Sequence, residues 1–146
     1  MGVFSRSVTV DWSGSIMEGK GVAKAGTGAF SLPVTFPSRI GEPAGTTSPE
    51  ELMAGSHAAC FAMALTGALG RKGGSTSRTR VTATVSADKG ETGITLTSSK
   101  LKVVAEGLQG MDAAAFKDVA TEAESKCPIS NALRRSLTIE LDVEVK

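Results

Sequence analysis

Two cysteines have the clearest potential for chemistry in this 146-residue chain. Cys60 lies in the apolar stretch HAACFAMAL, and Cys127 lies 67 residues later in SKCPIS. The thiolate is the nucleophilic form of cysteine, and only about 3% of a thiol with an unperturbed pKa near 8.5 is ionised at pH 7. Burial in an apolar helix raises a thiol pKa further. A reactive Cys60 therefore needs a fixed positive charge, and without one both cysteines are inert, small structural residues.

The neighbours of each cysteine add further expectations. Cys127 precedes Pro128, which disfavours helical geometry at Cys127 and suits the first turn of a short helix that follows. We therefore expect Cys127 at a helix N-cap, where backbone N–H groups can hydrogen-bond its sulfur, although a small residue filling a helix corner explains the position equally well. His57, three residues before Cys60, shares its helix face. It fits either a base for the cysteine or a hydrogen-bonded structural residue.

A long central helix must position Cys60. Ser48 is a suitable N-cap, Pro49 suits the first helical position, and Glu50 suits the positive end of the helix dipole. Residues 52–69 are apolar on nearly every side, which predicts burial on every side. The run is long enough for a membrane span, but its many Ala and Gly residues and its histidine disfavour one. Because a single domain has too little chain to enclose such a helix, we expect a homodimer and no membrane contact.

Alternating apolar and polar residues predict strands around this helix. The predicted strands cover residues 8–12, 81–88, 94–106 and 137–145, and a second helix begins near Asp112. In the third of these strands the apolar parity slips, which predicts a β-bulge at 98–100. The proline-rich segment 32–51 shows no periodicity and is expected to be an ordered loop. Because strands and helices do not alternate in regular βαβ units, we expect the α+β fold class, in one domain over residues 1–146.

Composition disfavours several classes of function. The net charge is +1 with 16 basic residues spread along the chain, so we expect no nucleic-acid partner. One histidine and two cysteines without a CxxC motif supply too few ligands for a zinc site, so we expect no metal. The N-terminus lacks a basic segment followed by an apolar core, and we therefore expect a cytoplasmic protein.

The blocks TSPEELMAGSHAACFAMAL and KCPISNAL resemble the OsmC/Ohr family of thiol-dependent hydroperoxide reductases, in the branch named for osmotically inducible protein C. The resemblance implies antiparallel sheets wrapped around long central helices in an intertwined homodimer, with active sites at the interface. It also implies that Cys60 is the peroxidatic cysteine and Cys127 the resolving one. The family places a catalytic arginine on the loop before the central helix and a glutamate at the start of that helix, and Arg39 and Glu50 match these roles.

The implied activity is the reduction of organic hydroperoxides, and more slowly hydrogen peroxide, to alcohols in oxidative or osmotic stress defence. A Cys60 sulfenic acid would form and be captured by Cys127, and an external dithiol of the dihydrolipoamide type would restore both thiols without a cofactor. An apolar pocket would favour organic substrates by roughly 0.8 kcal/mol per CH₂, with Phe36, Ile40 and Phe61 as candidate walls. The alternatives are a thiol redox sensor and a small-ligand binding protein without significant turnover.

Overall fold

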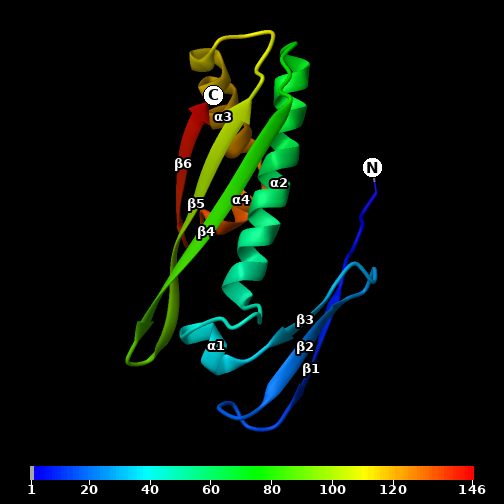
Figure 1. Cartoon of the computed structure of the whole chain (residues 1–146), viewed down its shortest axis with the longest axis vertical. Helices are drawn as coiled ribbons and strands as arrows, with labels where there is room; N and C mark the ends of the chain where they lie inside the picture. The colour runs from blue at the N-terminus through cyan, green and yellow to red at the C-terminus, as the bar shows by residue number, and fades with distance from the viewer. Residues whose placement is uncertain (1) are drawn as a thin grey trace. The chain divides into compact units, whose positions relative to one another are not determined.

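Three short strands, a short helix and the start of a long helix form the N-terminal unit of the computed structural model, which describes residues 2–146. This unit ends at Leu52, and a second unit spans Met53–Lys146. The N-terminal elements are β1 (Val8–Ser13), β2 (Lys20–Ala25), β3 (Ser31–Val34), α1 (Phe36–Ile40) and the first turn of α2 (Pro49–Arg71). The second unit holds the rest of α2, β4 (Arg78–Gly90), β5 (Gly93–Glu106), α3 (Ala113–Lys126), α4 (Pro128–Leu133) and β6 (Thr138–Val145) (Figure 1). Strands and helices thus form two small sheets with helices, and the α+β class is confirmed.

The N-terminal sheet is an antiparallel meander with the order β1-β2-β3. Val10 pairs with Ala23 and Trp12 with Gly21, so these residues share one face of the sheet. A Cβ added at Gly21 would lie 2.7 Å from Cε3 of Trp12, so the glycine makes room for the indole. This face carries the larger apolar side chains of the sheet.

The expectation of a loop over residues 32–51 is wrong in its first part. The segment contains β3 and α1, and Thr35 is the N-cap of α1, its Oγ1 accepting a hydrogen bond of 3.3 Å from the Ser38 N–H. The Thr47 N–H donates to the Pro33 carbonyl at 2.9 Å, which ties the residue before the Ser48 cap to β3. These contacts place the first turn of α2 close to α1.

The second sheet has the order β4-β5-β6, with β4 and β5 antiparallel and β5 and β6 parallel. Ser86 pairs with Ser98 and Ala87 with Leu96, which leaves Thr97 as the extra residue of a bulge. The bulge lies one residue before the predicted position. It corrects the parity slip, because apolar residues before and after Thr97 then face the same side of the sheet.

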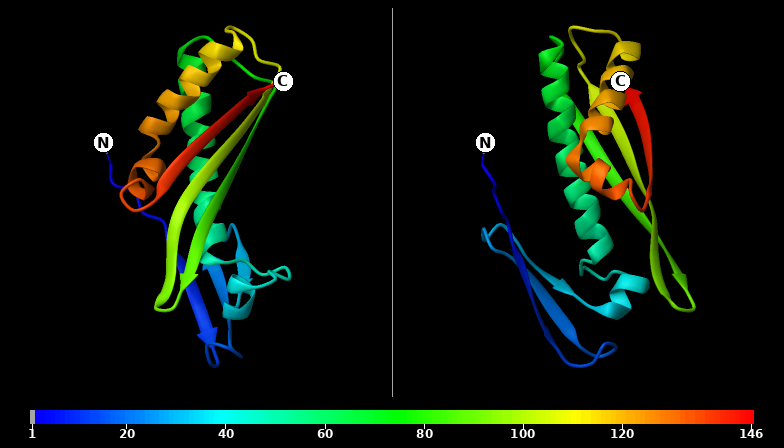
Figure 2. Two further views of the ribbon diagram at one scale, coloured as in Figure 1. Left: turned by 90° about the vertical axis from the view of Figure 1, so that its left-hand side faces the viewer. Right: turned by 180° about the vertical axis from the view of Figure 1, so that it is seen from behind.

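The parallel pairing of β5 with β6 requires a crossover connection, and α3 and α4 supply it. Asp112 is the N-cap of α3, with Oδ1 accepting a hydrogen bond of 2.8 Å from the Ala115 N–H. The body of α2 and both crossover helices lie on one face of the sheet (Figure 2). The fully buried side chains between them include Phe61, Leu65, Leu101, Val103, Phe116 and Cys127.

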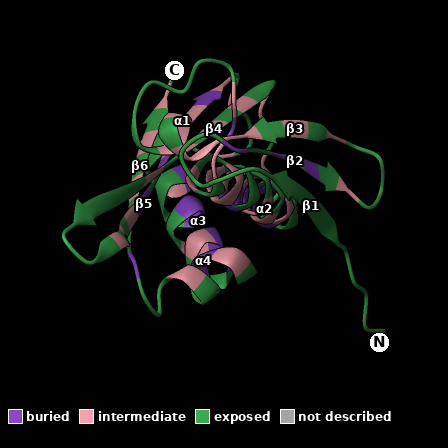
Figure 3. Cartoon of the chain, turned by 90° about the horizontal axis from the view of Figure 1, so that it is seen from below, coloured by how far each residue is buried: buried purple, intermediate pink, exposed green. Residues whose placement is uncertain are grey.

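The long helix α2 remains partly uncovered by its own chain. By length and composition it is apolar enough to cross a membrane, with a mean hydropathy of 1.4, and 28% of that window is buried within the chain. Met63 on this helix is 75% exposed. Strand β1 is exposed along its whole length (Figure 3). The single chain thus leaves a stripe of α2 exposed, as we expect for a helix that one domain of this length cannot enclose.

Candidate active site

The two cysteines meet in the second unit although they are 67 residues apart in the chain. Cys60 is partly buried on α2, and Cys127 is fully buried at the corner between α3 and α4. Both are free thiols, and the Cys127 thiol lies close enough to Cys60 to raise the pKa of the Cys60 thiol. This contact places the sulfurs next to each other, as disulfide formation requires.

Opposing effects act on the Cys60 thiol. Burial raises its pKa above the ordinary value, a hydrogen bond with the backbone N–H of Ile129 lowers the pKa, and the neighbouring Cys127 raises it. Ile129 lies in the first turn of α4, where helical N–H groups have no partner within the helix. The first turn of α2 is too distant to help, since Ser48 lies 12 residues before Cys60, roughly 18 Å along the axis. Within the second unit, the favourable contact to the Cys60 sulfur therefore comes from α4.

Cys127 occupies the predicted helix boundary, as the C-cap of α3 and the N-cap of α4. Its side chain makes no capping hydrogen bond, so the expectation that α4 N–H groups bond its sulfur is wrong. The Ile129 N–H of α4 instead lowers the pKa of the Cys60 thiol.

The Arg39 and Glu50 side chains meet within the N-terminal unit. Arg39 Nη2 lies 2.7 Å from Glu50 Oε1, and Arg39 Nε donates to Oε1 and Oε2 at 3.1 Å each. The hydrogen bond from Arg39 holds the pKa of Glu50 below its ordinary value, and the same bond raises the pKa of Arg39. Among residues 2–146, Arg39 Nη1 has no hydrogen-bond partner. The glutamate thus fixes the guanidinium and leaves one nitrogen available for a ligand.

A cavity of about 290 Å³ adjoins this ion pair. Its walls are almost wholly apolar, and the lining residues include Val10, Trp12, Ile16, Val34, Phe36, Pro49 and Leu52 beside Arg39. An apolar cavity with one fixed cation suits a small molecule that has an apolar body and a polar, electron-rich end.

The three predicted pocket walls have different surroundings. Phe36 lines the cavity beside Arg39. Ile40 does not line it and is 41% exposed. Phe61 is fully buried in the core of the second unit, so the expectation that it forms a pocket wall is not met, because no part of the ring is accessible to a substrate. Trp12 was missed by sequence reasoning, since nothing in its strand pattern indicated a cavity.

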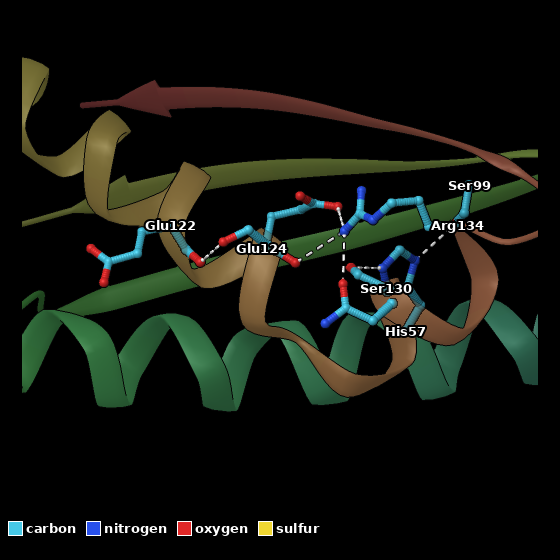
Figure 4. Close-up of polar contacts among 8 residues, drawn as sticks. His57, Ser99, Glu122, Glu124, Ser130 and Arg134 are labelled. Atoms are coloured by element: carbon cyan, nitrogen blue, oxygen red, sulfur yellow. Dashed lines mark hydrogen bonds and ion pairs between the residues drawn. The ribbon is translucent and has the colours of Figure 1, made fainter.

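His57 is fully buried and uses both ring nitrogens in hydrogen bonds to serine hydroxyls (Figure 4). Nδ1 lies 2.6 Å from Ser99 Oγ on β5, and Nε2 lies 2.7 Å from Ser130 Oγ on α4. These bonds favour the structural interpretation of His57 over the base, because no ring nitrogen is left to accept a proton from Cys60. Neither serine was predicted from the sequence. Ser99 and Ser130 lie 42 and 73 residues after His57 in the chain, so no local sequence pattern indicates these contacts.

A second polar cluster joins the two helices that meet at Cys127. Arg134 Nη2 lies 2.8 Å from Glu124 Oε1 and donates to Asn131 Oδ1 at 3.2 Å. Glu124 belongs to α3 and Asn131 to α4, so Arg134 joins the two helices that flank Cys127 (Figure 4).

Comparison with known proteins gives the family. Residues 41–142 match the profile of the OsmC-like protein family. The chain belongs to this family. It is 35% identical over 134 residues to the protein named peroxiredoxin OsmC of Escherichia coli K12, covering 91% of this chain and 92% of the relative. The OsmC-like resemblance of the two cysteine-containing blocks is thereby confirmed.

Two solved structures share the fold. One is an organic hydroperoxide resistance protein OsmC from Legionella pneumophila, with a TM-score of 0.74, 25% identity and coverage of 94% of this chain and 96% of the other. The second is an organic hydroperoxide resistance protein from Elizabethkingia anophelis, with a TM-score of 0.76, 24% identity and full coverage of both chains, 100% each.

These OsmC-like relatives support a peroxidase-like role for the chain, because the E. coli protein is named a peroxiredoxin. Among residues 2–146, no group of three or more His, Cys, Asp or Glu side chains is placed to hold a metal ion. The second unit offers the two neighbouring thiols, and the N-terminal unit offers the guanidinium that Glu50 fixes.

Proposed function

We propose that this OsmC-like protein is a thiol-dependent peroxidase that reduces organic hydroperoxides to alcohols through Cys60 and Cys127, in defence against oxidative or osmotic stress. The observation that carries the proposal is the contact between two free thiols from distant parts of the chain. Two inert cysteines would have no need to meet. A thiol next to a nucleophilic cysteine can capture its oxidised form before further oxidation.

The proposed first step is attack by the Cys60 thiolate on the outer oxygen of the hydroperoxide. The S–O bond forms as the O–O bond breaks, and the alkoxide leaves and takes a proton to become the alcohol. Cys60 becomes a sulfenic acid. The Cys127 thiolate then attacks the Cys60 sulfur, so the S–S bond forms, the S–O bond breaks, and hydroxide leaves as water after protonation. An external dithiol of the dihydrolipoamide type returns both thiols by exchange.

Arg39 is the proposed source of positive charge for the thiolate and for the departing oxygen. Glu50 holds Arg39 at the start of α2, and Cys60 lies ten residues further along the same helix, roughly 15 Å along its axis. We therefore propose that the Arg39–Glu50 pair of one subunit serves Cys60 of the other in a homodimer.

Exposed apolar side chains support the homodimer. Val10 is 54% exposed, Trp12 is 41% exposed, and Met63 on α2 is more exposed still. Large apolar side chains left exposed in each unit favour an interaction site, and a second subunit is the partner that the proposed active site also needs. The cytoplasm, where thiols are kept reduced, is the proposed location.

The apolar cavity beside Arg39 supports organic hydroperoxides as substrates. Each CH₂ group transferred from water to such a wall contributes roughly 0.8 kcal/mol. Cumene hydroperoxide should therefore react faster than hydrogen peroxide in stopped-flow measurements with excess dithiol. A redox sensor would form the same disulfide but would not sustain peroxide consumption.

Intact mass after one equivalent of peroxide tests the roles of the cysteines. The mass of the wild type should fall by two hydrogen atoms as the disulfide forms, Cys127→Ser should gain one oxygen, and Cys60→Ser should not change. Oxygen gained by Cys127 in the Cys60→Ser protein at the wild-type rate would reverse the assignment. A wild-type protein that consumes no peroxide would refute the proposed function.

A further inference from the structure

Resting on this proposed function, we propose that His57 is a positioning residue for both cysteines. Its hydrogen bond to Ser130 holds the first turn of α4 against α2. That turn supplies the Ile129 N–H to the Cys60 sulfur, and the residue before it is Cys127.

Helix α4 is too short to hold its own position. The helix has only six residues, Pro128–Leu133, and a helix this short is not stable without tertiary contacts. Ser130 lies one residue after Ile129 and three after Cys127, and its side chain is fully buried. A bond at Ser130 therefore fixes the part of α4 that matters to both sulfurs.

Among residues 2–146, the bond from His57 to Ser130 is the one hydrogen bond that joins a side chain of α2 to a side chain of α4. Its length is 2.7 Å, and the imidazole is held in turn at Nδ1 by Ser99 on β5. His57 thus connects three elements: the helix of Cys60, the sheet beneath it and the helix that follows Cys127. The Arg134–Glu124 ion pair braces the same corner from outside, without touching α2.

His57 acts here as a neutral hydrogen-bonding group. Burial lowers its pKa, with Glu124 raising the pKa and Arg134 lowering it by smaller amounts. A neutral imidazole has one N–H donor and one acceptor, and a serine hydroxyl can serve either. Both bonds can therefore form in either tautomer, and the ring brings no positive charge to the Cys60 thiolate.

Two substitutions of His57 separate the two bonds. In His57→Gln the side-chain amide reaches the position of Nε2 and can keep the bond to Ser130. In His57→Asn the amide reaches only the position of Nδ1 and can keep the bond to Ser99. Ser130→Ala removes the hydroxyl that bonds Nε2 and is the counterpart of His57→Asn. Ser99→Ala removes the hydroxyl that bonds Nδ1 and is the counterpart of His57→Gln.

The first measurement is the pH dependence of Cys60 alkylation by iodoacetamide in a Cys127→Ser background. Ser130→Ala and His57→Asn should each raise the Cys60 pKa by about one unit, and so lower the thiolate fraction at pH 7 about tenfold, because a hydrogen bond to a charged group is weakened. His57→Gln and Ser99→Ala should stay within about twofold of the wild type.

The second measurement is the rate of disulfide formation after one equivalent of cumene hydroperoxide, with Cys127 present. Ser130→Ala and His57→Asn should slow this step about 3- to 10-fold, as expected for a poorly positioned thiol. They should also increase the share of Cys60 that is over-oxidised to the sulfinic acid. His57→Gln should restore the wild-type rate.

Melting temperatures of all four variants separate positioning from general destabilisation. If all four variants lose melting temperature, thiolate reactivity and disulfide rate equally, His57 is merely structural. If all four keep the wild-type Cys60 reactivity and disulfide rate, α4 needs no such bond. Either result, or an effect of Ser130→Ala without one of His57→Asn, overturns the proposal. If His57→Asn does not fold, Ser130→Ala decides. The alkylation measurement uses no peroxide, so it tests the bond even if the wild type proves not to be a peroxidase.

Discussion

Oxidation should stabilise this protein by a large and predictable amount. A bond between Cys60 and Cys127 closes a loop of 67 residues, and the chain-entropy model gives about 4 kcal/mol at 25 °C for a loop of that length. The Cys127 thiol is a close neighbour of Cys60 in the reduced protein, so we expect the bond to form without large movements of the backbone. At roughly 2–4 °C per kcal/mol for a chain of about 150 residues, the melting temperature should rise by roughly 8–16 °C.

The assay compares the reduced protein with protein treated with one equivalent of cumene hydroperoxide, by thermal unfolding at one fixed protein concentration. Fixing the concentration matters because assembly also shifts the melting temperature. Cys127→Ser given the same treatment is the control and should gain no stability. An oxidised wild type that melts at or below the temperature of the reduced protein would refute the reasoning, since the bond would then distort the core around Cys127.

The remaining predictions concern the cation, the buried imidazole and the exposed helix. Arg39→Met should slow peroxide reduction about tenfold for each unit by which the Cys60 pKa rises. Glu50→Gln should act in the same direction more weakly. Stopped-flow rates equal to those of the wild type would exclude Arg39 as the cation that stabilises the thiolate. Burial depresses the His57 pKa below 6.5, so the unfolded state binds the proton first as the pH falls. The free energy of unfolding should therefore decrease below pH 6.5, by up to about 1.4 kcal/mol per pH unit. Urea midpoints at two pH values should show this decrease in the wild type and a smaller one in His57→Gln. Met63→Glu should give a monomer by light scattering at micromolar concentration, and a persistent dimer would show that this face of α2 is not the interface.

Strong local patterns made most of the fold predictable. Ser48 and Pro49 marked the start of α2, Asp112 marked the start of α3, and strict alternation marked β6. The missed segments are β2, β3 and α1. β3 and α1 have four and five residues, which is too short for a hydrophobic period to show. In β2 the buried positions are Gly21 and Ala23 while Val22 is exposed, so the strand shows no apolar alternation. Thr35 followed by Pro37 was the available signal for α1, since a capping residue before an early proline is typical of a helix start.

The site was predictable in its residues and not in its contacts. The cysteines, Arg39 and Glu50 were singled out from the sequence, and their catalytic roles stay predictions. The Ile129 N–H and the serines around His57 could not be found, because backbone groups have no sequence identity and serine hydroxyls have many partners. The N-cap position of Cys127 was correct, but which sulfur receives the N–H depends on how α4 packs on α2.

The crossover between β5 and β6 has a consequence for the protein as it is synthesised. Cys127 and the first turn of α4 belong to this crossover, so at about 5–20 residues per second they are made roughly 3–13 s after Cys60. Until then Cys60 has no neighbouring thiol to capture a sulfenic acid, but it also lacks the Ile129 N–H and is an ordinary, mostly protonated cysteine. We expect the nascent chain to be insensitive to peroxide for this reason, because the reactivity of Cys60 and its protection from over-oxidation arise in the same folding event.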